Sequence, residues 1–431
     1  MDPITHPAPN WRAAILKTAV AALLASGIYA GYRHYVQIRR EVAVLIDGPG
    51  GRGGGARSEM AKDTPAGWLR AEKLLEEVLR IHPRNAFGVV ALAEVETQLV
   101  GAGYGDRARR AEETLRKADA KGLPFAELFD AHALAMLQAG KAAEAEAYAR
   151  TLLDKYPALP AVPRFHDLLG RAQRGQGKLA DAKASFKRAQ DADWRQPRFV
   201  ADYAEVLLAE GDAAGAAAAF DRALQAHSGH IRSQIGKARA HVALARQGRG
   251  DAKAARALLD SVLRSPEQDL TPELRARALA ARAEAGLAGQ DTASAAEDSA
   301  AALALAPRHP ATLRARAIVD AAARRPIAAQ EFAAAIAADP ADASTYLDGA
   351  AALEIAGDLA GAAKLLAAHA SALQPTARYH LARARLLARQ GDAAGARAET
   401  AKATALDPAN ALALQEQGRG VERPKEARVA R

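Results

Sequence analysis

From about Gly67 onward, apolar and polar positions follow the spacing of amphipathic helices that are about 12 to 15 residues long. Short turns that carry Gly-Asp or Gly-Lys pairs, as at Gly177 and Gly211, interrupt this spacing, and prolines close many of the stretches. No alternation of the kind that marks strands runs through this region. The pattern therefore predicts an all-α fold.

The predicted helices come in pairs whose ends recur at a nearly constant distance. Successive pair ends are 33 to 41 residues apart, which indicates a period of about 34 residues with insertions. The ends lie at Pro83, Pro124, Pro157, Trp194, Ser228, Pro266, Pro307, Pro340, Pro375 and Pro408. This spacing predicts about ten helix-turn-helix units over residues 67–408.

Two neighbouring units share a set of small and aromatic positions: Gly170, Gly177, Ala182, Phe186 and Ala189 in one, and Ala204, Gly211, Ala216, Phe220 and Ala223 in the next. This set resembles the tetratricopeptide repeat. The resemblance implies an α-solenoid, a right-handed superhelix whose first helices line a concave groove that binds extended or helical peptides of partner proteins.

Each repeated position has a physical reason. Small residues such as Ala182 let the two helices of a hairpin approach, the turn glycine takes backbone angles that other residues resist, and the aromatic residue fills the gap to the next hairpin. Three places depart from the pattern: the lengthened turns Gly103–Asp106 and Gln247–Asp251, and Arg324, where the turn glycine is replaced.

The resemblance also places arginines on the expected groove. They are Arg164, Arg171, Arg174, Arg198, Arg232, Arg239, Arg378, Arg385 and Arg389. Since guanidinium groups bind carboxylates with two parallel hydrogen bonds, such a groove would favour acidic peptide segments. The alternative is that these arginines are ordinary solvated residues of alanine-rich helices.

Before the repeats, residues 12–35 predict one transmembrane helix that follows an N-terminal tail, residues 1–11. Trp11 at one end and Tyr29, Tyr32 and Tyr35 at the other would be its interfacial anchors. A cleaved signal peptide is the competing interpretation, because small residues at 25–27 follow the apolar stretch. The charges that flank the helix favour a cytoplasmic repeat region by a narrow margin, and a periplasmic one stays open.

Residues 36–66 are expected to be a juxtamembrane segment and a glycine-rich flexible linker. A strand at Val42–Asp47 followed by a phosphate-binding loop was the alternative, but the lysine that this loop requires is missing after Gly55. At the other end, residues 409–431 predict a short capping helix and a disordered basic tail.

Composition changes this picture little. The chain has 431 residues, no cysteine and a formal net charge of +9. The basic residues are dispersed, so no nucleic acid is expected as a partner. The absence of cysteine excludes disulfides, thiolate metal sites and thiol catalysis but does not indicate a compartment.

The sequence contains none of the motifs that would indicate catalysis. His227 and His230 form an isolated pair without a third ligand, and no zinc-protease or serine-hydrolase motif occurs. We therefore expect no enzyme, no catalytic residue, no metal and no cofactor.

The expected function is a scaffold in the bacterial inner membrane, anchored by a single span, that assembles or stabilises an envelope complex through protein partners. The alternatives are a non-catalytic regulatory or chaperone-like assembly factor, for secretion, pili or motility, polysaccharide export or cytochrome maturation, or an unrecognised enzyme.

Overall fold

A computed structural model describes residues 33–51, 54–120, 125–266, 269–372 and 376–406 of the chain. Every regular element in these ranges is a helix, which confirms the prediction of an all-α fold. Residues 33–47 are helical. The remaining elements are η1(Pro49–Gly51), α2(Ala56–Ala61), α3(Pro65–Ile81), α4(Ala86–Gly101), η2(Gly105–Arg107), α5(Ala108–Asp119), α6(Ala126–Gln138), α7(Ala142–Lys155), α8(Val162–Arg174), α9(Leu179–Ala192), α10(Pro197–Glu210), α11(Ala213–Ala226), α12(Ile231–Arg246), α13(Ala252–Leu263), α14(Pro272–Ala288), α15(Thr292–Leu305), α16(Pro310–Ala322), α17(Ala328–Ala338), α18(Ala343–Ala356), α19(Leu359–Ala372), α20(Ala377–Arg389) and α21(Ala393–Leu406).

Helix starts are fixed by local chemistry. Thr64, Asn85 and Asp212 precede α3, α4 and α11, and the side chain of each accepts a hydrogen bond from a backbone N–H in the first turn. Pro197 and Pro310 occupy the first position of α10 and α16, where the missing N–H has no intrahelical partner to lose. These signals keep successive helices short and separate.

The expected packing of small against aromatic residues is confirmed. A Cβ atom added to Gly170 on α8 would lie 2.7 Å from the ring of Phe186 on α9. The ring of Phe220 on α11 packs in the same way against Gly236 of the next hairpin. Both rings are fully buried, so the glycines are needed for the close approach of the helices.

The turn glycines also adopt the expected backbone. Gly140, Gly177 and Gly211 have φ angles of +73°, +71° and +95°, in the left-handed region. Arg324 replaces the turn glycine in its repeat and has a φ angle of +56°. In the turn after α14, Gln290 is the left-handed residue, with a φ angle of +65°. The turn geometry is therefore kept even where the residue that favours it is absent.

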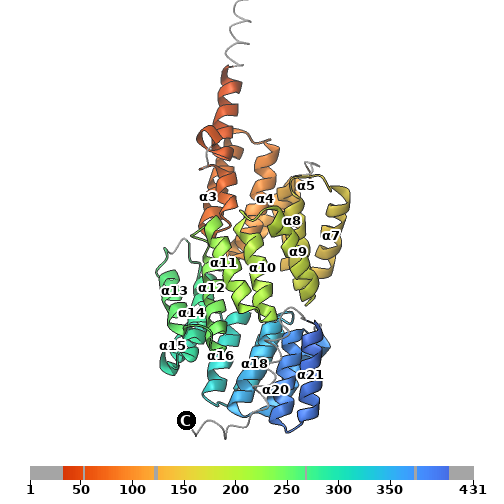
Figure 1. Ribbon diagram of the computed structural model, residues 1–431. Coiled ribbons are helices and arrows are strands. Elements are labelled where there is room, and N and C mark those ends of the chain that lie inside the picture. The colour runs from red at the N-terminus through yellow and green to blue at the C-terminus, as the bar shows by residue number, and fades with distance from the viewer. Residues whose placement is uncertain (1–32, 52–53, 121–124, 267–268, 373–375, 407–431) are drawn as a thin grey trace, which may run out of the picture.

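The helices form two layers. Each even-numbered helix from α4 to α20 contacts the next even-numbered one, and the odd-numbered helices from α5 to α21 pack against them from outside. The inner layer therefore consists of the first helices of the successive hairpins (Figure 1).

Successive turns of this superhelix touch one another. Asp63, just before α3, lies 3.4 Å from His230 before α12, and the Arg378 side chain donates a hydrogen bond of 3.3 Å to the carbonyl of Ala209. Leu179 packs with Tyr346 in one buried cluster. These residues are about 170 positions apart in the sequence, so one turn takes about five hairpins.

At the N-terminal side, the helix of residues 33–47 leads away from α3 at one end of the molecule (Figure 1). Its Val42 and Ile46 are buried against a core that includes Trp68 and Leu75. The strand considered for Val42–Asp47 is therefore wrong, because this segment is helical. The linker region also contains α2, whose Ala56 is fully buried.

The predicted transmembrane segment, residues 12–35, lies outside the described residues except for its last three positions. Among the helices that the structure does describe, none is both long enough and apolar enough to cross a membrane. The tail at residues 1–11 and the capping helix and tail at 409–431 also lie outside the described residues.

Candidate functional site

Buried carboxylates and arginines alternate along the inner helices. Arg164 on α8 lies 2.5 Å from both Glu94 on α4 and Asp130 on α6, and Arg198 on α10 lies 3.1 Å from Asp167 on α8. Arg198 also approaches Asp130 to 3.6 Å. We call this row of five residues, Glu94, Asp130, Arg164, Asp167 and Arg198, the charge ladder. It joins four successive inner helices.

Burial sets the electrostatics of the charge ladder. It raises the pKa of Glu94 to about 8 and the pKa of Asp167 to about 7, because the charged form loses its hydration. Burial alone would lower the pKa of Arg198, but Asp167, Asp63 and other carboxylates raise it above its usual value. The guanidinium groups of Arg164 and Arg198 therefore stay charged, whereas Glu94 and Asp167 give up their protons less easily than exposed carboxyl groups.

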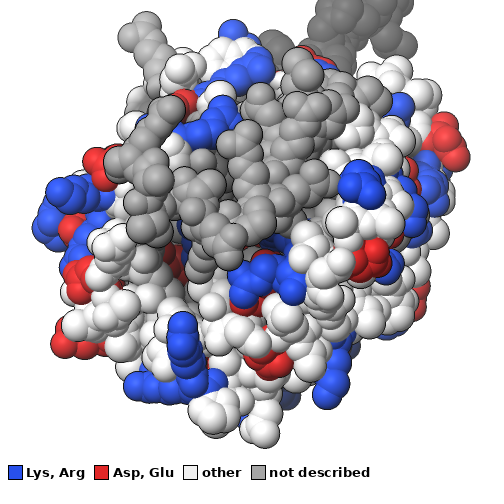
Figure 2. Space-filling model, turned by 60° about the horizontal axis from the view of Figure 1, so that its bottom comes forward, with Lys and Arg blue, Asp and Glu red and all other residues white. Residues whose placement is uncertain are grey.

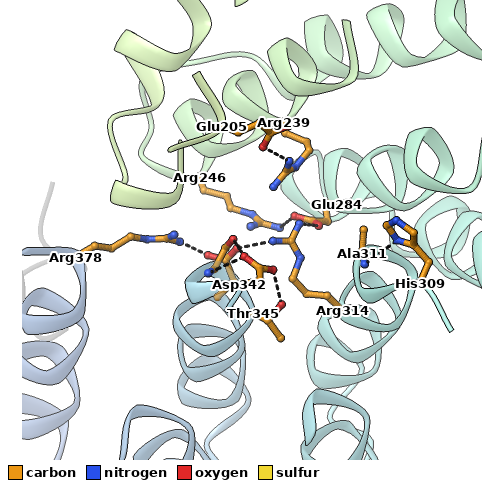
Figure 3. A network of polar contacts seen from close by, with 12 residues as sticks. Glu205, Arg239, Arg246, Glu284, His309, Ala311, Arg314, Asp342, Thr345 and Arg378 are labelled. Atoms are coloured by element: carbon orange, nitrogen blue, oxygen red, sulfur yellow. Dashed lines mark hydrogen bonds and ion pairs between the residues drawn. The ribbon is translucent and has the colours of Figure 1, made fainter. Parts of the chain in front are cut away.

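A second group of ion pairs continues along the later inner helices (Figure 3). Arg239 on α12 lies 2.8 Å from Glu205 on α10, and Glu284 on α14 receives hydrogen bonds from Arg246 at 3.1 Å and from Arg314 at 2.9 Å. Arg378 on α20 pairs with Asp348 on α18. Each pair connects neighbouring hairpins, so the inner wall is held by charge as well as by apolar packing.

The inner helices line an open cavity of about 580 Å³. Its charged lining is balanced: the six arginines are Arg171, Arg174, Arg232, Arg239, Arg277 and Arg314, and the six carboxylates are Asp63, Glu205, Glu273, Glu284, Asp339 and Asp342. We refer to it as the inner cavity. The resemblance implies a basic groove on these helices, whereas the charged residues of the inner cavity are of both signs and lie beside apolar ones such as Leu137, Ile231 and Ile235.

The structure places the nine predicted arginines in different surroundings. Arg171, Arg174, Arg232 and Arg239 line the inner cavity. Arg164 belongs to the charge ladder and Arg378 to the pair with Asp348. Arg385 and Arg389 on α20 are exposed and lie near Glu354 on α18.

Arg198 requires a correction. It was expected on the groove surface, but it is only 3% exposed because it lies between Asp130 and Asp167 behind that surface. A partner cannot reach its guanidinium group without opening the wall.

Sequence reasoning did not pair the groove arginines with carboxylates. Arg232 pairs with Asp202, 30 positions earlier, and Arg239 pairs with Glu205, 34 positions earlier. Arg314 and Glu284 are separated by 30 positions. An aspartate or glutamate about one period before Arg232, Arg239 and Arg314 is the signal that could have revealed these pairs.

The predicted histidine pair lies at the edge of the inner cavity, which His230 lines. His230 is buried beside Asp63 and its Nδ1 lies 2.7 Å from the Ser233 hydroxyl, while burial lowers the pKa of His227. No cluster of histidine and carboxylate side chains that could hold a metal ion occurs in the described part of the chain. On the face shown in Figure 2, basic and acidic side chains are interspersed rather than gathered into one basic surface.

No family model matches the sequence, and no curated protein matches it either. Solved structures do. A tetratricopeptide repeat protein from Parabacteroides merdae is 16% identical, with a TM-score of 0.35 over 69% of this chain and 99% of its own. The Cut9–Hcn1 hetero-tetramer of the APC/C is 14% identical, with a TM-score of 0.47 over 83% and 73%.

The human IFIT1 dimer with m7Gppp-AAAA is 14% identical as well, with a TM-score of 0.45 over 85% of this chain and 86% of that one. In the described residues this chain is itself an all-helical array of hairpins. At these scores the likeness assigns neither a ligand nor a partner.

Proposed function

We propose that this chain is a protein-binding scaffold that holds an extended segment of a partner in its inner cavity. The observation that carries the proposal is the cavity itself, which is lined by helices from successive hairpins and presents charged groups of both signs beside apolar side chains. Such a lining matches the mixed hydrogen-bonding groups of a polypeptide.

The rigidity of the wall supports binding. The charge ladder and the pairs around Glu284 tie neighbouring inner helices together, so the cavity is formed before a partner arrives. A preformed surface lowers the entropy cost of binding.

We also propose that the chain has no catalytic activity of its own. The two carboxylates with strongly raised pKa values on the inner helices, Glu94 and Asp167, belong to the wall and do not line the cavity. Because such perturbation arises in structural ion-pair networks as well as in active sites, they are better explained as parts of the charge ladder.

The membrane part of the proposal rests on the sequence. Residues 12–35 would anchor the scaffold in the bacterial inner membrane, and the helix of residues 33–47 leads away from one end of the array (Figure 1). The role would be the assembly or stabilisation of an envelope complex.

Affinity capture of the tagged full chain from its native membranes tests the function. Arg171→Glu combined with Arg174→Glu reverses charge inside the cavity, and Arg249→Glu is a control in an exposed turn. Arg198 is left unchanged because its removal would open the wall. We expect the cavity variant to lose partners that the control retains. If circular dichroism shows that the cavity variant and the control are both folded, and both capture the same partners, the proposal is contradicted.

A further inference from the structure

A second open space lies where successive turns of the superhelix meet. It has a volume of about 620 Å³ and lies between the lengthened turn after α4 and the turns that precede α14 and α16. We call it the seam pocket, and its walls include Tyr104 on one side and Pro272, Leu305, Pro307 and His309 on the other. The two sides come close together, because a Cβ atom added to Gly103 would lie 3.0 Å from Oε2 of Glu273. The seam pocket is therefore formed by the superhelix and not by any single hairpin.

Most of the residues around the seam pocket are apolar. Leu305, the last residue of α15, is 43% exposed, and Pro272 and Pro307 are exposed as well. Covering a leucine side chain removes apolar surface from water, which is favourable. The seam pocket thus offers apolar contact area that the fold itself leaves uncovered.

The carboxylates of the seam pocket already have partners. Nε2 of His309 lies 3.3 Å from Oε1 of Glu273, and a carboxylate oxygen of Asp106 lies 3.4 Å from Nη1 of Arg107. Arg308, the remaining charged residue of the lining, is exposed. Apolar contact is therefore the main interaction that this pocket offers to a ligand.

The lengthened turn after α4 builds one wall of the seam pocket. The backbone N–H of Tyr104 donates a hydrogen bond of 3.0 Å to the carbonyl of Leu99, and its ring packs partly against the core around Leu75. The guanidinium group of Arg107 lies 5.1 Å from the centroid of the same ring. These contacts hold the ring in place, so the wall is formed before a ligand binds.

The seam pocket is continuous with the inner cavity. Ala102, Glu273, His309 and Pro310 line both spaces. A hydrogen bond of 3.1 Å from the N–H of Ala311 to Nδ1 of His309 orients the histidine ring at this junction (Figure 3). A polypeptide that lies in the inner cavity can therefore reach the seam pocket without leaving the surface of the molecule.

We propose that the partner segment in the inner cavity continues past His309 and places one large apolar side chain, aliphatic or aromatic, in the seam pocket. This inference rests on the proposed function and adds a specific anchor to it. Apolar anchors that fill pockets carry much of the affinity of protein interfaces. The seam pocket would therefore select among segments that the mixed lining of the inner cavity accepts equally.

Arrays of short synthetic peptides test the proposal with the purified full chain. In each peptide that binds, every large apolar residue is replaced in turn by asparagine. We expect one of these replacements to weaken binding at least about tenfold. Leu305→Asp should weaken the same peptides by a similar factor, because it places a charge against the anchor. The control Ile355→Asp, at a 76% exposed position on α18, should leave binding unchanged.

A comparison of single and combined changes identifies the contact. When the chain carries Leu305→Asp, replacing the anchor of the peptide by asparagine should cause little further loss, because the contact is already gone. Losses that multiply independently would place the anchor elsewhere on the molecule and overturn the proposal.

Urea unfolding separates a binding role of Leu305 from a structural one. Because Leu305 and Ile355 are both exposed, Leu305→Asp and Ile355→Asp should unfold at similar urea concentrations. If Leu305→Asp unfolds earlier, the milder Leu305→Ala replaces it and should weaken peptide binding about threefold. Unchanged binding to a folded Leu305→Ala chain would overturn the proposal.

The remaining outcomes separate this inference from the proposed function. Peptides that are weakened by Arg171→Glu with Arg174→Glu, but not by Leu305→Asp, would remove the anchor and leave the scaffold function standing. Peptides that neither change affects, or an array without any bound peptide, would contradict both. A chain that sediments as a dimer, and as a monomer with Leu305→Asp, would assign the seam pocket to a second copy of the chain instead.

Discussion

At the scale of single residues, His369 on α19 is the most unusual group. It is fully buried, its ring stacks on Tyr379 with centroids 4.8 Å apart, and the Tyr346 ring meets it edge-on at 5.6 Å. Neither of its ring nitrogens has a hydrogen-bond partner. Burial, with the nearby charge of Arg378, lowers the pKa of His369 to about 4.

The first prediction concerns acid stability. The unfolded chain takes up a proton at a histidine pKa near 6.5, while folded His369 resists protonation down to about 4, so stability falls as the pH drops between these values. At pH 5 the loss should be about 2 kcal/mol. We expect His369→Phe, which keeps the aromatic stacking, to remove this part of the loss. Urea unfolding of the unchanged chain and of His369→Phe at pH 5 and pH 7.5 measures this loss. An equal pH dependence of the free energy of unfolding in the two proteins would show that His369 is not its source.

At the scale of helices, the hairpins depend on small residues between their two members. Ala182 on α9 is fully buried, whereas Ala180, two positions earlier on the same helix, is exposed. The same substitution therefore meets a packed interface at one position and solvent at the other.

We predict that Ala182→Leu lowers the free energy of unfolding by about 1 to 3 kcal/mol through overpacking, whereas Ala180→Leu changes it by less than about 0.5 kcal/mol. Ala216→Leu, in the equivalent buried position of the next hairpin, should behave like Ala182→Leu. Thermal melting of the three variants measures the difference. Equal melting temperatures would contradict the assigned register of the repeats.

The charge ladder acts between helices rather than within them. Removing Arg198 would leave Asp130 and Asp167 buried with less compensation, and both carboxylates are fully buried. We predict that Arg198→Met costs about 3 to 5 kcal/mol, while Arg249→Met in an exposed turn costs almost nothing. Urea midpoints of the two variants make the comparison, and similar midpoints would show that the charge ladder contributes little.

Some of these features could be predicted from the sequence and others could not. The hairpins were predictable because Gly170, Phe186 and the turn at Gly177 act on neighbours within one unit. The pairing of arginines with carboxylates was not predicted, since each partner stands about 30 positions away and becomes visible only when two units are compared in register.

At the scale of the whole molecule, the superhelix is closed by contacts between its turns. The contact of Asp63 with His230 joins the residues just before α3 and α12, and both side chains are nearly inaccessible to solvent. Contacts between residues so far apart in the sequence could not be predicted from the repeats. The number of hairpins in one turn of the superhelix depends on the small rotation between neighbouring hairpins, which adds up along the array.

We predict that Asp63→Ala loosens two distant helices together, α3 and α12. Burial alone would raise the pKa of Asp63, but His230, Arg198 and Arg232 bring it below its usual value, so its carboxylate stabilises the fold above pH 4 and this contribution is lost as the pH falls through the lowered pKa. Hydrogen exchange at pH 7 should become faster in both helices. The control Asp106→Ala, at an exposed carboxylate, should leave α12 unchanged.

Exchange that increases in α3 alone would show that the turns of the superhelix do not support each other in solution. The same result would leave the hairpins intact, since their packing does not involve Asp63.

The central claim is that a partner polypeptide occupies the inner cavity, and site-specific photo-crosslinking in the native cells tests it most directly. A photoreactive phenylalanine analogue placed at Leu137 or Ala311, which line the cavity, should crosslink the same partner, while the analogue at Ala218 on the outer helix α11 should not. Crosslinks from Ala218 with none from Leu137 or Ala311 would contradict the account.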